Sequence, residues 1–495
     1  MNENPRHDRD NREPSSSSLK KRLRTLSFLL DDGEEERPTW VAAWIILGLA
    51  LVLMVFLWKP WIHGNDGVRN YVYCRSLWID GDLDFANEFD HYRTVGELQI
   101  PASPDRVTGR QGNAVGIGSG LFWSPFFLAA HLVSKVVGGS ADGYSALYAW
   151  AISFGSTFYA IVGLVLLTRV LSWRFDSRSA LIGLIGVWLG SPLVFYMYMH
   201  PSMSHAVSFF LCSLIVWEYE RWRHHTAAWH FVVIGITTGL AVATRFDNAV
   251  YVLLLAAFWA RSRLAPLLAQ THRRGSIRSA ALSIVLIIVG FLIGFWPQMA
   301  AWRAMYGSYL AGPRDYELGR TLSLWDSPNL GSVLISGHRG LFVWSPVLLL
   351  ALIGLVRLAA LGRRLADSML VAAFAVQVWV IGGWGMWWGG ASFGQRFFID
   401  LVPAFALGLT CIARDVRFKP NRRIFMTAIA LCLLWSAGLA VQYVGGIVDR
   451  ERPVRFVELA RNQFTAVPVW IVRHAAVIFP GLHHESPTLP QEPRG

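Results

Sequence analysis

The chain is poor in charged residues. Of its 495 residues only 16% are charged, whereas 54% are hydrophobic, and its mean hydropathy is positive. This shortage of charge excludes an ordinary soluble domain and predicts an all-α polytopic membrane protein, because an open sheet cannot satisfy its backbone in lipid. Hydrophobic segments recur along the whole chain at lengths near the roughly 20 residues with which a helix crosses a bilayer.

Cysteine is also scarce, and the excess of basic residues lacks the clustering of a nucleic-acid-binding surface. The four cysteines form no CxxC pair, which excludes a zinc signature and a disulfide framework. The formal net charge is +12, but the basic residues are dispersed between hydrophobic segments. Such dispersal is typical of loops that set membrane topology, so we expect no nucleic-acid partner.

The distribution of charge sets the expected topology. Residues 1–38 are polar and predict a disordered cytoplasmic tail. The segment Trp40–Trp58 lacks a small-residue cleavage site after it, so we interpret it as a retained anchor helix that runs outward. If Val115–Val137 also crossed the bilayer, every later basic loop would lie outside, against the positive-inside rule. We therefore predict a re-entrant or membrane-surface helix within one long first extracytoplasmic loop, residues 59–143.

This topology gives about eleven transmembrane helices in a domain of residues 39–443. Residues 444–495 then form an extracytoplasmic C-terminal tail. Two predicted helices are short for a full crossing and are interpreted as tilted or partly buried in the bundle. After the first helix, the predicted spans are Tyr144–Val170, Ala180–Tyr198, Ser202–Tyr219, Trp229–Ala243 and Asn248–Ala260 (the two short ones), Ala280–Met299, Leu341–Leu358, Ser368–Trp384, Ile399–Ala413 and Ile424–Tyr443.

The first loop holds the densest acidic cluster among the loops, with six carboxylates within residues 63–90. Asp66 opens a helical pattern, so it is either a catalytic carboxylate or a helix cap. The carboxylates of Asp80–Asp84 lie in a D-G-D turn and are more typical of solvated turn residues or weak cation ligands than of catalysts. Glu88 lies between two phenylalanines, where partial burial can move the pKa of a carboxyl group, which makes it a second catalytic candidate.

Two further outer turns carry candidate site residues. His200 and His205 flank a proline and a short polar turn, and they are either site residues or structural histidines at the membrane interface. Arg245 lies two residues before Asp247, which predicts an ion pair at a helix junction.

A glycine-rich loop in the last third of the chain combines aromatic and basic residues. Trp387 and Trp388 lie among glycines and close to Arg396. The tryptophans could form only an interfacial belt, but a glycine-rich backbone lets a ligand approach closely and an indole offers a flat face to a sugar ring. A guanidinium group suits a phosphate, so Arg396 is the first candidate for phosphate binding, with Arg245 and Arg339 as further candidates.

Four stretches of the chain resemble those of the glycosyltransferase C superfamily. The resemblance is closest to bacterial members of the family 39 group, the protein-mannosyltransferase-like and aminoarabinose-transferase-like membrane glycosyltransferases. The stretches are NDGVRNYVYCRSLWIDGDLDFANE, GLAVATRFDNAVYVLL, RGLFVWSPVLLL and WWGGASFGQRFFIDLVP, spread over about Asn65–Pro403. Their order along the chain and the expected topology both agree with that superfamily.

The resemblance implies a specific reaction. Such enzymes take a sugar from a polyprenyl-phosphate donor that reaches the site from the bilayer, and they transfer it with inversion to a lipid or glycan acceptor. An Asp of the first loop is the general base, and Asp66 matches that position. The resemblance also implies a multi-pass protein among the lipids of a bacterial inner (plasma) membrane, with a cytoplasmic N-terminus and an extracytoplasmic active site.

Two departures from the family pattern leave other interpretations open. Gly67 stands where many relatives have Glu, and the histidine-bearing turn Met199–His205 replaces a second acidic residue. Whether a divalent metal such as Mg²⁺ or Mn²⁺ serves as cofactor is therefore undecided by the sequence. The alternatives are a non-catalytic binding protein of the same fold, or a transporter or flippase of lipid-linked sugars. The transporter is disfavoured because it needs ionisable residues near the bilayer midplane, and the span interiors offer almost none; Gln377 and Gln442 are polar but uncharged.

Overall fold

The protein is described by a computed structural model that covers residues 40–223, 227–265, 273–311, 323, 325–362, 364–416 and 419–478. The predicted cytoplasmic tail, residues 1–38, lies outside the described residues, as do residues 479–495 of the predicted C-terminal tail. Over the described ranges the chain is helical, with no strand and one isolated bridge between Pro104 and Gln111. The all-α prediction is therefore confirmed.

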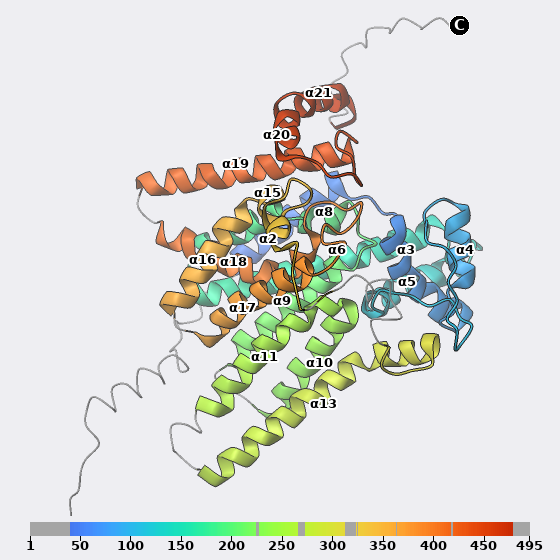
Figure 1. The fold of residues 1–495 in the computed structure, drawn as a ribbon, viewed down its shortest axis with the longest axis horizontal. Helices are drawn as coiled ribbons and strands as arrows, with labels where there is room; N and C mark the ends of the chain where they lie inside the picture. Colours follow the sequence, from blue (N-terminus) through green and yellow to red (C-terminus); the bar gives the residue numbers. More distant parts are fainter. Residues whose placement is uncertain are drawn as a thin grey trace, which may run out of the picture.

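The predicted first loop forms a group of short helices at one end of the bundle, on the right of Figure 1. Helix α3 begins at Gly64, earlier than the apolar pattern from Val68 indicated, because the preceding segment is held in place by contacts described below. The elements up to the end of this loop are α2 (Trp40–Leu57), α3 (Gly64–Arg75), η1 (Ser76–Asp80), α4 (Ala86–Thr94) and α5 (Gly118–Val136).

The middle of the chain forms the largest part of the bundle. The predicted span Ala180–Tyr198 is broken at Ser191–Pro192, since proline lacks the N–H group that a continuous helix needs. The elements are α6 (Ala146–Arg174), α7 (Ser177–Gly190), α8 (Leu193–Tyr198), α9 (His205–Trp222) and α10 (Ala228–Thr244). They continue with η2 (Phe246–Tyr251), α11 (Val252–Trp259), η3 (Ala260–Leu264) and α13 (Arg273–Tyr306).

The last part of the chain completes the bundle and adds two short helices packed on α19 (Figure 1). Its elements are α14 (Leu330–Ile335), α15 (Leu341–Trp344), α16 (Val347–Gly362), α17 (Leu365–Gly382) and η6 (Arg396–Leu401). They end with α18 (Val402–Asp415), α19 (Lys419–Val444), α20 (Phe456–Phe464) and α21 (Ala466–Ile478).

The described helices have the length and composition of a helical membrane protein. Six helical segments are long and apolar enough to cross a membrane, and three shorter apolar helices accompany them. Helix α5 is not among the six, and the expectation of about eleven spans stays a prediction. The six are Trp40–Leu57, Ala146–Arg174, Ile277–Tyr306, Leu365–Gly382, Arg396–Asp415 and Asn421–Val444.

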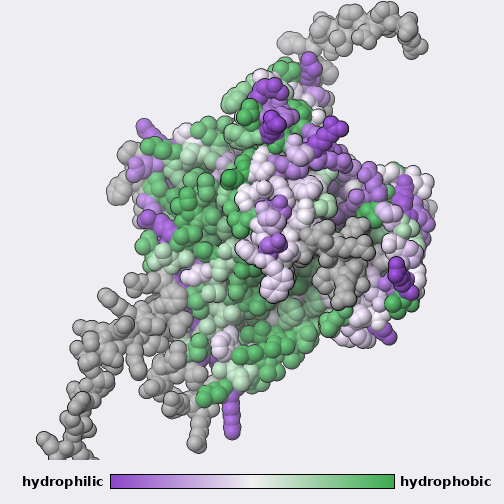
Figure 2. Space-filling view, viewed as in Figure 1, coloured by the Kyte–Doolittle hydropathy of each residue, from purple (hydrophilic) through white to green (hydrophobic). Residues whose placement is uncertain are grey.

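The outer surface agrees with this assignment. Figure 2 shows apolar side chains over the middle of the bundle and hydrophilic side chains gathered at its margins. Large exposed hydrophobic residues lie on α2, α13 and α19, for example Val55, Leu292 and Leu434. An apolar surface of this extent would be unfavourable in water and suits contact with lipid.

Glycines allow α10 and α13 to pack with their backbones in contact. A Cβ atom on Gly239 would lie 2.3 Å from the carbonyl oxygen of Phe291, and one on Gly290 would lie 2.2 Å from that of Val232. Gly235 and Gly294 face the partner helix in the same way. Both helices thus present two glycines four residues apart, the small-residue pattern by which membrane helices approach closely.

Buried ion pairs lie at the far ends of α6 and α9 from the short helices of the first loop. Arg174 donates hydrogen bonds of 2.8 and 2.6 Å to the two carboxylate oxygens of Asp367, and it lies 3.4 Å from Glu220. Such a bidentate pair compensates for the loss of water around both charges. It fixes the first turn of α17 against the last turn of α6.

Two buried carboxylates lie next to the ends of predicted spans, outside the span interiors that were expected to lack ionisable residues. Glu218 is buried in α9 and accepts a 2.8 Å hydrogen bond from Thr237. Asp400 is buried at the start of the predicted span Ile399–Ala413 and is paired with Arg245 at 2.9 Å. Both carboxylates have partners that a linear sequence does not reveal, which is why the spans can contain them.

Candidate active site

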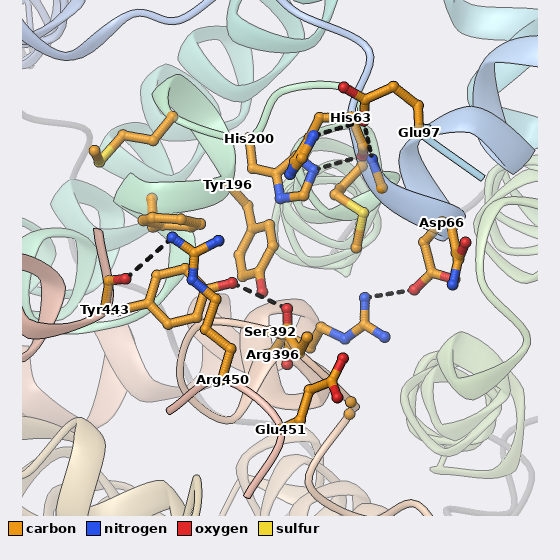
Figure 3. Close-up of a pocket in the computed structure, with 18 of the residues that line it drawn as sticks. His63, Asp66, Glu97, Tyr196, His200, Ser392, Arg396, Tyr443, Arg450 and Glu451 are labelled. Carbon is orange, nitrogen blue, oxygen red and sulfur yellow. Dashed lines mark hydrogen bonds and ion pairs between the residues drawn. The ribbon is translucent and has the colours of Figure 1, made fainter. Parts of the chain in front are cut away.

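A cavity of about 740 Å³ lies where the first loop meets the glycine-rich tryptophan loop. Five segments line it: residues 59–66 at the start of α3, residues 96–99 after α4, α8 with the turn that follows it, the loop before η6, and the end of α19 with the segment after it (Figure 3). Of the residues singled out from sequence, the cavity brings together four, which are Asp66, His200, Trp388 and Arg396.

Asp66 and Arg396 form an ion pair at the wall of the cavity. A carboxylate oxygen of Asp66 lies 2.6 Å from Nη1 of Arg396 (Figure 3). The capping interpretation of Asp66 is wrong, because the N-cap position of α3 is His63 and Asp66 lies within the first helical turn. The Asp66 side chain therefore lines the cavity, where its carboxylate is paired with Arg396.

The charges around Asp66 favour its ionised form. Burial alone would raise the pKa of the Asp66 carboxyl group, but the positive charges of Arg396 and Arg69 and the hydrogen bond from Arg396 outweigh it. The net result is a pKa below the ordinary value for aspartate. At neutral pH this side chain is a carboxylate that can accept a proton.

Residues after α4 hold the start of α3. The Glu97 carboxylate accepts hydrogen bonds from the Nδ1 atom of His63 at 2.6 Å and from the backbone N–H of Gly64 at 3.1 Å. The side chain of Asn65 accepts a 2.9 Å bond from the backbone N–H of Gln99. Gly64 has a φ of 70°, a left-handed conformation that glycine adopts without strain.

The turn between α8 and α9 supports the same segment from the other side. His200 donates a 2.9 Å hydrogen bond from Nε2 to the carbonyl oxygen of His63, and the hydroxyl of Ser202 accepts one from the His63 N–H. Burial is the main cause that lowers the pKa of His200, to about 4, so the imidazole is neutral and can donate. His200 thus lines the cavity but acts on His63.

Gly67 lies at a close contact between α3 and the turn before α9. A Cβ atom at this position would lie 2.6 Å from the Ser202 hydroxyl oxygen and 3.7 Å from Nε2 of His200. A side chain at position 67 would therefore displace the Ser202 hydroxyl, which accepts a hydrogen bond from the His63 N–H.

The tryptophan loop turns sharply beside Arg396. Gly389 and Gly390 both have positive φ angles, 78° and 70°, which lets the chain reverse after Trp388. Trp388 lines the cavity, whereas Trp387 is 9% exposed and packs edge-on against Trp388. The predicted ligand contact of Trp387 is therefore corrected to a supporting role, because only one indole of the pair faces the cavity.

Arg339 lies behind the cavity wall rather than in it. Its guanidinium group is fully buried and donates to the carbonyl oxygens of Ser392 at 2.5 Å and Arg450 at 3.1 Å. It also lies over the rings of Trp344 and Tyr443. Burial is the main cause that lowers its pKa, to about 10. The predicted phosphate-binding role is corrected to one of holding two cavity-lining segments together.

Arg245 and His205 lie outside the cavity lining. Arg245 is paired with Asp247 at 2.7 Å and with Asp400 at 2.9 Å, which confirms the predicted ion pair and occupies the guanidinium group. His205 is fully buried against the ring of Tyr196. Neither side chain reaches the cavity, so their predicted contacts to the donor are corrected to structural roles.

Glu88 is likewise separated from Asp66. It is fully buried, outside the cavity lining, and lies 2.9 Å from Arg75. The predicted displacement of its pKa is present, since burial raises the value to about 8. The catalytic role predicted for Glu88 is therefore corrected to a structural one. Its partner Arg75 also contacts Asp80 of the D-G-D turn, at 2.5 Å.

Several residues that line the cavity were not predicted from the sequence. His63 and Glu97 line it from the first loop, and Arg450 and Glu451 line it from the segment after α19. His63 lies three residues before Asp66 in the same turn and could have been noticed for that reason. Glu97, Arg450 and Glu451 are distant in sequence and carry no local signal.

The described part of the chain holds no cluster of side chains suited to a metal centre. Within the part of the chain that the structure describes, no group of three or more His, Cys, Asp or Glu side chains could hold a metal ion. The Asp66 carboxylate is taken up by Arg396. The carboxylates of Asp80–Asp84 bind side chains and backbone N–H groups of their own turn and of neighbouring loops.

Comparison with known protein families finds no family model that matches the chain. A search of curated proteins finds no significant match either.

Proposed function

We propose that this protein is a membrane glycosyltransferase that moves a sugar from a polyprenyl-phosphate donor to an extracytoplasmic lipid or glycan acceptor, with inversion at the anomeric carbon. The observation that carries the proposal is the pairing of Asp66 with Arg396 at one cavity wall, beside Trp388, in a bundle of membrane-type helices. A base, a cation for phosphate and an aromatic face for a sugar are the three groups that this reaction needs.

Asp66 is the proposed general base. It takes the proton from the acceptor hydroxyl as the oxygen attacks the anomeric carbon, and it needs only to be positioned and ionised. The lowered pKa of the carboxyl group meets the second condition. Its place in the first turn of α3, held by Glu97 and His200 through His63, meets the first.

Arg396 is the proposed partner of the leaving group. The bond between the anomeric carbon and the phosphate oxygen breaks, and the phosphate departs with the electron pair. A guanidinium fork stabilises the resulting charge. The hydrocarbon tail of the donor would lie between the helices, which explains why such an enzyme is built in a membrane. We place the protein in the bacterial inner membrane, with about eleven spans and its active site outside.

The test uses purified protein with radiolabelled polyprenyl-phosphate hexoses and membrane acceptors. Asp66→Asn should lower transfer by about 100-fold or more, the range for loss of a general base. The same variant should bind polyprenyl phosphate several-fold more tightly, because the carboxylate no longer competes with phosphate for Arg396. Arg396→Gln should lose that binding.

Asp90→Asn is the matched control, since Asp90 is an exposed carboxylate in α4 of the same loop and lies outside the cavity. Transfer at the wild-type rate by Asp66→Asn would refute the base assignment. Tight lipid-phosphate binding by a wild type that transfers no hexose would instead indicate a binding protein of the same fold.

A further inference from the structure

The two short helices that follow α19 carry an unusual number of exposed hydrophobic side chains. α20 and α21 contain 9 and 13 residues, and together they expose six large hydrophobic side chains. A surface of this kind is unfavourable in water and marks a contact with another apolar body. The six are Phe456 (53% exposed), Val457 (75%), Phe464 (81%), Val469 (48%), Ile471 (41%) and Val472 (75%).

Both helices pack against the last part of α19, at the margin of the bundle (Figure 1). Gln463 of α20 donates a 2.7 Å hydrogen bond to the carbonyl oxygen of Trp435. A Cβ atom on Gly445 would lie 2.7 Å from Nε1 of Trp470 in α21. The contacts thus extend along residues 435–445, which corresponds to about 15 Å of helix length.

The part of α19 that they contact belongs to a membrane-type helix. Residues 421–444 are one of the six segments long and apolar enough to cross a membrane, and Leu431 and Leu434 are exposed on its surface. Tyr443 and Val444, at the end of this segment, line the cavity. Half the hydrocarbon thickness of a bilayer is about 15 Å. α20 and α21 therefore lie beside a span at the depth of one leaflet, on the side of the cavity.

The charges of this region suit the surface of an anionic membrane. Residues 452–478 contain four arginines and a single carboxylate, that of Glu458. Arg455, Arg461 and Arg473 are exposed. Arginines beside an apolar helix face are typical of helices that lie in the membrane interface, with their cations at the lipid phosphates. The indole of Trp470, next to the end of α19, also suits that level of the bilayer.

We propose that α20 and α21 are embedded in the leaflet on the side of the cavity and bind anionic phospholipids. Their exposed hydrophobic side chains lie among the acyl chains, and Arg455, Arg461 and Arg473 lie at the phosphate groups. This inference rests on the membrane-type helices and not on the proposed glycosyl transfer. Because Arg450 and Glu451 precede α20 and line the cavity, these two helices join the cavity wall to the membrane surface.

The test is the membrane depth of a nitroxide spin label on the full-length protein, in bilayers of phosphatidylcholine and phosphatidylglycerol. Oxygen concentrates in lipid whereas a nickel chelate stays in water, so the ratio of their collision rates with the label reports its depth. The label is attached to Val472→Cys in a Cys432→Ala background, because the other three cysteines are buried. The ratio should be several-fold higher than that of a label in water.

Two valines of similar exposure provide matched controls. Val55→Cys lies on the membrane-type helix α2 and is 81% exposed, whereas Val107→Cys lies in the first loop and is 79% exposed. The label at position 472 should resemble the one at position 55. A ratio equal to that at position 107 overturns the proposal. A label that collides with neither reagent also overturns it and indicates a protein partner, such as a second copy of this chain, over the same surface.

A second measurement tests the preference for anionic headgroups. A bimane fluorophore at position 472 should be quenched about twofold or more better by spin-labelled phosphatidylglycerol than by spin-labelled phosphatidylcholine at equal content. Replacing Arg455, Arg461 and Arg473 together by glutamine should abolish this difference. A fluorophore at position 55 should be quenched equally by the two lipids. Equal quenching at position 472 in the protein that keeps the three arginines overturns the contact with anionic headgroups.

Discussion

At the scale of single residues, the protonation of His200 makes the stability of the folded protein depend on pH. Burial keeps its imidazole neutral in the folded protein, with a pKa of about 4, whereas an unfolded histidine titrates near 6.5. The unfolded chain therefore binds more protons between these values, and the folded state loses stability as the pH falls from about 6.5 to 4. We expect a loss on the order of 1–3 kcal/mol from this group.

His200→Gln tests this expectation, because glutamine still donates to the His63 carbonyl oxygen but does not titrate. Thermal unfolding of the purified protein, followed by tryptophan fluorescence at pH 7 and pH 4.5, should show a smaller fall in the melting temperature for this variant than for the wild type. His474→Gln, at an exposed histidine, should behave as the wild type. Equal falls in all three proteins would contradict a neutral His200.

Single residues also show which parts of the site a sequence can predict. Asp66, Trp388 and Arg396 were predicted because a carboxylate, an indole among glycines and an arginine are chemically conspicuous in outer loops, and the structure places all three at one cavity. Arg339 and Glu88 were equally conspicuous, but their roles depend on burial and on distant partners. Sequence patterns contain neither.

At the scale of helices, the contact between α10 and α13 depends on the absence of side chains. Gly290→Ala places a Cβ atom 2.2 Å from the carbonyl oxygen of Val232, so the helices must separate. We expect a destabilisation of about 1–3 kcal/mol from this overpacking. The measurement is the midpoint of thermal unfolding in the same detergent.

Gly48→Ala in α2 is the matched control, because nothing lies within 4 Å of the added Cβ atom. It should unfold at or above the wild-type temperature, since alanine favours a helix more than glycine does. If Gly290→Ala unfolded at the same temperature as Gly48→Ala, the close approach of α10 and α13 would be refuted.

Helices were predicted well where hydrophobicity is continuous and poorly where the chain changes direction. The expected span Tyr144–Val170 corresponds to α6, and Trp229–Ala243 corresponds closely to α10. Asn248–Ala260 instead consists of the short pieces η2 and α11 before η3, since Asn248 and Asp247 engage in hydrogen bonds at the start of the segment. Hydrophobic length cannot indicate such breaks.

At the scale of the whole molecule, the cavity is assembled from both ends of the chain. The first loop supplies Asp66, while the segment after α19 supplies Arg450 and Glu451. That segment is anchored where Arg339 donates to the Arg450 carbonyl oxygen, and where Gln442 donates to the carbonyl oxygen of Leu459 in α20. What sequence analysis treated as a C-terminal tail is therefore part of the site, a long-range contact that no local pattern predicts.

Arg339→Met tests this dependence, because methionine keeps an unbranched apolar stem but donates no hydrogen bond. The segment after α19 should then detach from the tryptophan loop, so trypsin should cleave after Arg450 faster in the folded variant than in the wild type. Transfer should fall by about tenfold or more, as expected when a positioning contact is lost. The melting temperature of Arg339→Met should change proportionately less than its rate of transfer.

The control for charge and size is Arg357→Met, since Arg357 is paired with Asp415 at the cytoplasm-facing end of the proposed topology and its side chain is 53% exposed. This variant should keep both the wild-type cleavage pattern and transfer. Unchanged cleavage and transfer in Arg339→Met would mean that the segment after α19 holds its place without the buried guanidinium. The cavity wall that Arg450 and Glu451 form would then depend on the contacts between α20 and α19, and not on Arg339.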